Sequence, residues 1–431
     1  MTTTLDRYRS SVRRRRRRAE LANHRLDLQG LRAVAVLAVF AAHLWGWPGG
    51  GFVGIDVFFV ISGFLVTDSL LRTAEHTTTI GFRRFYWKRI RRIVPAAAVV
   101  LVLTHFAARL ALPAAQAENV GADAVFGYFF LANWRFVALG TDPVIAAASA
   151  SPLQHFWALS VGAQFFLFWP ALIFVIALIA RRMTWPPKRW LLSTGVAVAV
   201  LAAASFALAT YQTASAPDLA YFSTATRLWE LAVGALLAVT AGAWARLPGP
   251  ARPALSWTGL ALIAAALVLV GPGSVGYPAP WALLPVVGTA LVIGAGIGGE
   301  PRFQGLLSNR ISTYLGDLAY ALYLVHLPVI VLLGTVMGAG LHYYVCALSV
   351  AFGLAIALHH IVEKPLRSAD LQVVRDARAA YRHGLLTPDR SVKAAAVAAL
   401  VLVTIGLISF ATRPDAFTPV VPTESPAVSR V

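Results

Sequence analysis

Apolar residues occur along the chain in long runs separated by short polar or Gly- and Pro-containing connections. Most of these runs are long enough to cross the hydrocarbon core of a bilayer as helices of about 20 residues. The pattern therefore predicts an all-α fold, a polytopic bundle of transmembrane helices. Twelve apolar segments are expected, with approximate bounds 31–47, 53–71, 93–110, 121–139, 155–180, 190–211, 221–242, 254–271, 280–298, 312–335, 341–362 and 394–412.

Composition strengthens this prediction. Of the 431 residues, 58% are apolar and only 13% are charged, which excludes an ordinary soluble globular protein. Cys346 is the only cysteine, so neither an internal disulfide nor a thiol-based metal site is available. No two histidines share a helix face at ligand spacing within a span, and no metal site is predicted.

Basic residues indicate how the spans are oriented. Most of the 37 Lys and Arg residues fall in six stretches, which the positive-inside rule places in the cytoplasm. Twelve full crossings would put some of these stretches on opposite sides, so one segment between the second and third stretches must not cross. The weakest is 121–139, which is interrupted by Gly127, Asn133 and Arg135, and we expect it to be re-entrant or interfacial. About eleven spans remain, with the N-terminus in the cytoplasm and the C-terminus outside.

Five parts are expected along the chain. The six consecutive arginines Arg13 to Arg18 lie beside a span, where they fix orientation and contact anionic lipid, so the bilayer is an expected partner and nucleic acid is not. The last span leads only to a short tail rich in Pro, Ser, Thr and Val. That span either exports a linker towards an outer domain or simply covers the bundle. The expected parts are a basic cytoplasmic arm (1–28), a transmembrane domain (29–367), a cytoplasmic linker (368–393), a last transmembrane helix (394–412) and an extracytoplasmic linker-like tail (413–431).

The first apolar segment carries one ionisable residue, His43, which we expect near the middle of a membrane helix. An ionisable group inside a membrane is costly and indicates a functional site. Arg32 precedes it by about 16 Å along a helix. Reflecting position 43 through the WPGGG turn predicts that Asp56 faces His43 and orients its imidazole, although Asp56 could instead only cap the second helix.

Other polar residues also fall within or beside the apolar segments. Arg89 and Arg92 lie three residues apart on one helical face, where they could bind phosphates or only anchor the helix at the membrane boundary. Arg227 and Glu230 are also three residues apart and most simply pair with each other. His326 is a second histidine within a span.

Taken in chain order, these segments resemble the acyltransferase 3 family of integral membrane acyltransferases. The resemblance runs from about His24 to Arg367. The family pattern of arginine, ten residues and histidine corresponds to Arg32 and His43, and its paired arginines correspond to Arg89 and Arg92. The motifs that carry the resemblance are LDLQGLRAVAVLAVFAAH, GGGFVGIDVFFVISGFLVT, KRIRRIVP, HFWALSV, TRLWELAVGALLA, YALYLVHLPVI and VEKPLR.

The resemblance implies transfer of an acyl group, often acetyl, from cytoplasmic acyl-CoA to a hydroxyl of an envelope carbohydrate or glycolipid at the bacterial cytoplasmic membrane. Acyl-CoA is then a substrate, bound by Arg32, Arg89 and Arg92, and no resident cofactor is implied. His43 would be the general base or a transient acyl carrier, oriented by Asp56. Some members carry an extracytoplasmic SGNH-type domain after an eleventh helix, and here such a domain is expected to be lacking or supplied separately. The residues implied to line an acceptor pocket are Trp157, Arg227, Glu230, Tyr323 and His326.

One departure from the family pattern concerns the segment ALSVGAQ. Gly162 and Ala163 stand where two glutamates are common, so a role of those acids in acceptor binding or proton handling would be lost. Two other functions stay open. A transporter or flippase of envelope lipids or sugars would show repeated halves with broken helices, and no clear repeat is visible. A catalytically degenerate membrane scaffold is the third alternative.

Overall fold

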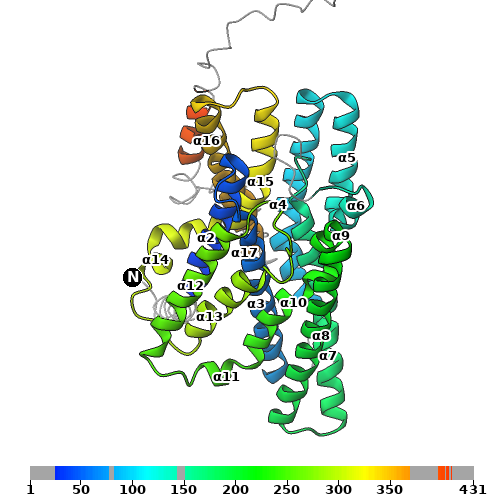
Figure 1. The fold of residues 1–431 in the computed structure, drawn as a ribbon, viewed down its shortest axis with the longest axis vertical. Helices are drawn as coiled ribbons and strands as arrows, with labels where there is room; N and C mark the ends of the chain where they lie inside the picture. Colours follow the sequence, from blue (N-terminus) through cyan, green and yellow to red (C-terminus); the bar gives the residue numbers. More distant parts are fainter. Residues whose placement is uncertain are drawn as a thin grey trace, which may run out of the picture.

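The computed structural model describes residues 25–76, 82–142, 151–368, 397–402, 404–406 and 409. These residues form helices joined by turns and loops, with no strand among them (Figure 1). In chain order the elements are α2 (Leu26–Trp45), the 3₁₀-helix η1 (Gly51–Val53), α3 (Gly54–His76), α4 (Phe82–Ala111), α5 (Ala114–Tyr128), α6 (Ala132–Ala138), α7 (Phe156–Arg182), α8 (Pro187–Ser215), α9 (Pro217–Phe222), α10 (Thr224–Val239), α11 (Ala241–Trp244), α12 (Ala251–Leu269), α13 (Leu283–Ala295), α14 (Gly305–Ser308), α15 (Arg310–Gly334), α16 (Leu341–Ala357), the π-helix η3 (Leu358–Glu363) and α17 (Lys364–Ser368).

The predicted all-α fold is confirmed for the described part of the chain. Eight of its helices are long and apolar enough to cross a membrane: α2, α3 with η1, α4, α7, α8, α12, α15, and α16 with its continuation. The count of about eleven spans stays a prediction, because α10 and α13 have only 16 and 13 residues. The last expected span, 394–412, lies only partly within the described residues. Almost all of the arginine-rich arm, the linker 368–393 and the tail 413–431 lie outside them.

The segment 121–139 does not form one continuous helix. The chain breaks between α5 and α6, where Phe130 adopts a positive φ of 55°. The Gln164 side chain on α7 covers the break, donating hydrogen bonds to the carbonyl of Phe130 at 2.8 Å and to the side chain of Asn133 at 2.9 Å. Arg135 forms an ion pair with Asp123. Protein groups thus satisfy the polar atoms that a single membrane helix would leave unpaired.

The centre of the bundle is formed by α2, α3 and α15. In the apolar 18-residue stretch of α15, 78% of the residues are buried, and in that of α3 the buried share is 72%. In α8 only 17% of the corresponding stretch is buried, which places α8 at the periphery of the bundle. In Figure 1, α3 lies between α13 on one side and α7 and α8 on the other.

Glycines allow two close helix crossings in this centre. A Cβ added at Gly63 in α3 would overlap the carbonyl oxygen of Leu231 in α10, and one added at Gly316 in α15 would overlap that of Gln29 in α2. Small residues let membrane helices approach until their backbones touch. The α2–α15 crossing brings the first helix beside one near the end of the bundle, and the candidate site is built along this contact.

Candidate active site

A cavity of about 190 Å³ lies among α2, α3, α4, α7 and α15, and is bounded at one end by η3 and α17. Four guanidinium groups line this end: Arg32 from α2, Arg89 and Arg92 from α4, and Arg367 from α17. The three arginines that the sequence predicted to act together therefore do line one cavity. Arg367 was not among them.

The arginine end of the cavity carries excess positive charge. Within the described residues none of these four arginines forms an ion pair, and Arg32 donates only a long hydrogen bond, 3.3 Å, to the Gln29 side chain. The carboxylates in the lining are Asp317 and Glu363. Such a concentration of guanidinium groups suits an anion with several phosphates, because each group can make charge-assisted, bidentate hydrogen bonds to phosphate.

Away from the arginines the cavity is lined mainly by apolar side chains, among them Phe58 and Leu159, and it reaches Tyr323. Gly162 lies in this wall, and a Cβ added there would meet no atom within 4 Å. Ala163 does not line the cavity. Of the two positions that depart from the family pattern, only Gly162 therefore affects the cavity. Because glycine has no side chain, the space beside Gly162 stays open.

Replacing Gly162 with leucine is expected to narrow the cavity and, if the cavity binds the acyl donor that the resemblance implies, to lower kcat/KM for that donor about tenfold, equivalent to about 1.4 kcal/mol. Folding should not change, because the added Cβ has free space. The matched control is Gly242→Leu in α11, which is also free of neighbours within 4 Å but lies on the surface. Steady-state kinetics on both variants would measure the effect. An unchanged kcat/KM for Gly162→Leu would show that the donor does not occupy this part of the cavity.

Three histidines lie together on the other side of Tyr323. His43 Nδ1 is 3.3 Å from His326 Nε2, and the His155 and His326 rings are 5.2 Å apart. Tyr323 lines the cavity, and its ring is 5.6 Å from that of His326. The Tyr323 hydroxyl donates to the backbone carbonyl of His155 at 2.7 Å. The Tyr323 side chain thus stands between the arginine-lined cavity and the histidines.

His43 lies elsewhere on its helix than the sequence suggested. The helix starts at Leu26 and ends at Trp45, so His43 belongs to its last turn and is half-buried. The prediction of a mid-helix position was wrong, because polar residues before the apolar run, beginning with Asp27, also adopt helical structure. The His43 side chain keeps part of its surface accessible, and it lies at the opposite end of α2 to Arg32.

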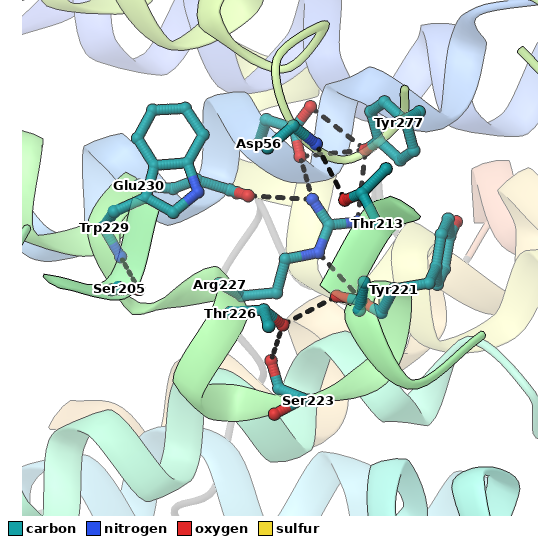
Figure 2. Close-up of polar contacts among 12 residues, drawn as sticks. Asp56, Ser205, Thr213, Tyr221, Ser223, Thr226, Arg227, Trp229, Glu230 and Tyr277 are labelled. Atoms are coloured by element: carbon teal, nitrogen blue, oxygen red, sulfur yellow. Dashed lines mark hydrogen bonds and ion pairs between the residues drawn. The ribbon is translucent and has the colours of Figure 1, made fainter. Parts of the chain in front are cut away.

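Asp56 does not orient His43. Its carboxylate accepts a hydrogen bond from Arg227 at 3.1 Å and hydrogen bonds from the Tyr277 hydroxyl at 3.0 and 3.1 Å (Figure 2). The reflection through the turn estimated the position of Asp56 along the helix but not the face to which its side chain points. That face of α3 packs against α10.

Figure 2 shows Arg227 at the centre of this second polar cluster. Arg227 donates to Glu230 at 2.8 Å, as the spacing predicted, and its guanidinium lies 5.0 Å from the ring centres of Tyr221 and Tyr277. Burial raises the pKa of the Tyr277 phenol, on the connection after α12, well above its ordinary value. The phenol therefore keeps its proton and donates a hydrogen bond to Asp56.

The residues predicted for an acceptor pocket divide between the two clusters. Trp157 packs 5.3 Å from the Arg227 guanidinium, and these two residues and Glu230 are almost completely inaccessible. None of these three lines the cavity, whereas Tyr323 does, and His326 belongs to the histidine cluster. The pocket role of all five stays a prediction.

Sequence reasoning missed several residues of the cavity and the histidine cluster. His155 belongs to the HFWALSV motif, and Glu363 and Arg367 belong to VEKPLR. The motifs therefore included these residues, but the sequence did not show that they lie at the cavity or in the histidine cluster. The π-helical turn η3 positions Glu363, whose carboxylate accepts from His359 Nδ1 at 3.0 Å. Such turns in helices are frequent at functional sites.

These features define a multi-pass helical membrane protein with an arginine-lined cavity beside a cluster of histidines. Residues 25–360 match the family described as an acyltransferase domain, and the chain belongs to this acyltransferase 3 family. No solved structure matches the chain.

Three relatives illustrate the family. "Putative peptidoglycan O-acetyltransferase YrhL" of Bacillus subtilis is 32% identical over 79% of this chain and 54% of its own length. "Peptidoglycan O-acetyltransferase OatA" of Listeria monocytogenes is 33% identical over 49% of this chain and 33% of its own length. "Putative O-acetyltransferase SACOL0978" of Staphylococcus aureus is 27% identical over 80% of this chain and 58% of its own length. The chain thus spans between a third and three fifths of the relatives that it matches.

Proposed function

We propose that the protein is a membrane O-acyltransferase that moves an acyl group, most simply acetyl, from cytoplasmic acyl-CoA to a hydroxyl of an envelope glycan. The observation that carries the proposal is the cavity itself, with arginines at one end and, beyond Tyr323, a histidine with a free ring nitrogen. Membership of an acyltransferase family supports the reaction class, and the names of the relatives support peptidoglycan as the glycan.

In this proposal Arg32, Arg89 and Arg92 bind the phosphates of acyl-CoA, and Arg367 adds a fourth guanidinium group. The less polar pantetheine arm follows the apolar wall past Gly162. The thioester reaches His43 when the Tyr323 side chain moves aside, and the closed position of Tyr323 keeps water from the thioester before then.

The accessible side of His43 receives the acceptor. His43 Nε2 takes the proton from the acceptor hydroxyl while the hydroxyl oxygen attacks the thioester carbonyl carbon. The tetrahedral intermediate then expels the CoA sulfur, which takes the proton back from His43 Nε2. The products are an ester and CoA with a free thiol.

The sidedness of the reaction follows from the expected orientation of the spans. The distribution of basic residues supports an orientation with the arginine end of the cavity at the cytoplasm, where acyl-CoA is made, and the end of α2 with His43 towards the outside. An SGNH-type domain supplied separately would then meet the acyl group on the outer side.

The test of this proposal is donor binding and turnover by the detergent-solubilised full chain. Arg89→Ala/Arg92→Ala is expected to raise the Kd for acetyl-CoA about a hundredfold, because hydrogen bonds to charged groups contribute about 1.5 to 3 kcal/mol each. Titration calorimetry measures the affinity, and release of free CoA with and without peptidoglycan fragments measures turnover.

Arg83→Ala/Arg84→Ala is the matched control, since both arginines lie on α4 but are exposed and outside the cavity. Equal loss of affinity in both double variants would mean that the cavity does not bind the donor. A folded wild-type protein that binds no acyl-CoA would refute the acyltransferase proposal in favour of a transporter or a scaffold.

A further inference from the structure

The hydrogen bonds of the histidine cluster determine which ring nitrogens carry protons. A backbone carbonyl can only accept, so a ring nitrogen bonded to one must be protonated. His43 Nδ1 lies 2.8 Å from the carbonyl of Val39, and His326 Nδ1 lies 2.7 Å from that of Tyr323. Both neutral rings therefore carry the proton on Nδ1 and leave Nε2 as a lone pair.

The two rings face each other with complementary atoms. The His43 Nδ1–H donates to the Val39 carbonyl at 2.8 Å, and the lone pair of His326 Nε2, 3.3 Å from His43 Nδ1, is a second and longer acceptor for the same hydrogen. Neither contact involves His43 Nε2, so this nitrogen keeps the lone pair that a general base needs. His326 Nε2 is a neutral acceptor at the ring position where a carboxylate would orient the base in a Ser-His-Asp triad.

From this geometry we propose that His326 is the positioning residue of His43, in the role that the sequence assigned to Asp56. The inference rests on the proposed function, because it concerns how His43 gains and returns a proton. When His43 Nε2 takes a proton, positive charge spreads over the ring, and the Nδ1–H bond to His326 becomes charge-assisted and stronger.

The neutrality of His326 distinguishes it from the carboxylate of a Ser-His-Asp triad. A neutral imidazole acceptor stabilises the positive charge that develops on His43 less than a carboxylate would. Asp56 is not available for the role, because Arg227 and Tyr277 occupy its carboxylate.

The surroundings of His326 contain two other ionisable groups. Tyr323 and His155 both contact its ring. His155 donates through Nε2 to the carbonyl of Leu324 at 3.1 Å, and its buried Nδ1 has no hydrogen-bond partner among the described residues. His155 thus packs against the His326 ring, and among the described residues it makes no hydrogen bond to His43.

Three variants of His326 test the proposal. His326→Phe removes the side-chain acceptor, leaves only the Val39 carbonyl, and is expected to lower kcat about a hundredfold, while the Kd for acetyl-CoA stays within about twofold. His326→Gln keeps an acceptor oxygen and is expected to retain activity within about tenfold of wild type. His326→Asp places a negative charge beside His43 and is expected to move the acidic limb of the kcat/KM profile up by about one pH unit or more.

His155→Phe is the matched control, since it changes the same cluster without touching the bond to His43, and its acidic limb should not move. A folded His326→Phe variant with wild-type kcat overturns the proposal. If that variant does not fold, the Asp variant decides: an acidic limb at the wild-type position overturns it.

A readout that needs no turnover separates this inference from the proposed function. In ¹³C-histidine-labelled protein, the pH at which the His43 imidazole resonance titrates is expected to rise in His326→Asp and to stay constant in His155→Phe. A shift in a protein that transfers no acyl group would refute the proposed function alone. Identical titration in wild type and His326→Asp would refute the pairing.

Discussion

Replacing His43 with alanine is expected to lower the rate of acyl transfer about a thousandfold, within the range found for general bases. Acetyl-CoA should still bind within about twofold of wild type, because His43 does not line the arginine-lined cavity and Tyr323 lies between them. The effect should therefore appear in kcat and not in the donor Kd. Release of CoA in the presence of peptidoglycan fragments measures kcat, and calorimetry measures the affinity.

His342→Ala is the control, since His342 lies in the first turn of α16 and, within the part of the chain that the structure describes, its side chain makes no hydrogen bond or ring contact with the histidine cluster. It should transfer acyl groups at the wild-type rate. Full activity of His43→Ala would exclude His43 as base or acyl carrier. A parallel loss of donor binding would instead place His43 in the donor site. It would contradict the proposal that the Tyr323 side chain separates His43 from the cavity that binds the donor.

Replacing Arg227 with methionine is expected to have the largest effect on stability. Arg227 has no exposed surface, and it pairs with two carboxyl groups that are equally inaccessible, those of Asp56 and Glu230. Removing one partner of a buried ion pair typically costs about 3 to 5 kcal/mol, because the remaining charge has no compensation. That cost approaches the whole stability of many proteins. We expect little folded protein, measured by size-exclusion chromatography and thermal unfolding in detergent.

Two further variants separate charge from packing. Arg246→Met removes an exposed arginine and should leave the melting temperature unchanged. The triple variant Asp56→Asn/Arg227→Met/Glu230→Gln removes all three charges while keeping similar volumes, and should recover most of the stability. If Arg227→Met melts at the wild-type temperature, the cluster is not what holds α3, α10 and the connection after α12 together.

Prediction from sequence succeeded where the signal was local. Long apolar runs identify membrane helices because each helix must satisfy its own backbone in lipid. The pairing of Arg227 with Glu230 followed from helical spacing within one element.

Prediction failed where two distant elements had to meet. His326 lies next to His43 only because α15 crosses α2 at close range, and no local pattern reports that crossing. Asp56 was assigned to His43 because the turn places the two residues at similar heights, yet height along a hairpin does not specify which face of the helix a side chain occupies. Because α3 packs against α10, the Asp56 side chain faces α10 and its carboxylate accepts a hydrogen bond from Arg227.

The single uninterrupted helix that carries both Arg32 and His43 imposes a length on the proposed reaction. Ten residues of α-helix separate them, a distance of about 16 Å along the axis. A short donor such as acetyl phosphate, held by the arginines, would keep its acyl group beside them and out of reach of the histidine. A donor with a long arm between its phosphates and its thioester spans the gap. The distance between Arg32 and His43 along this helix therefore selects donors whose phosphates and thioester lie far enough apart to reach both residues.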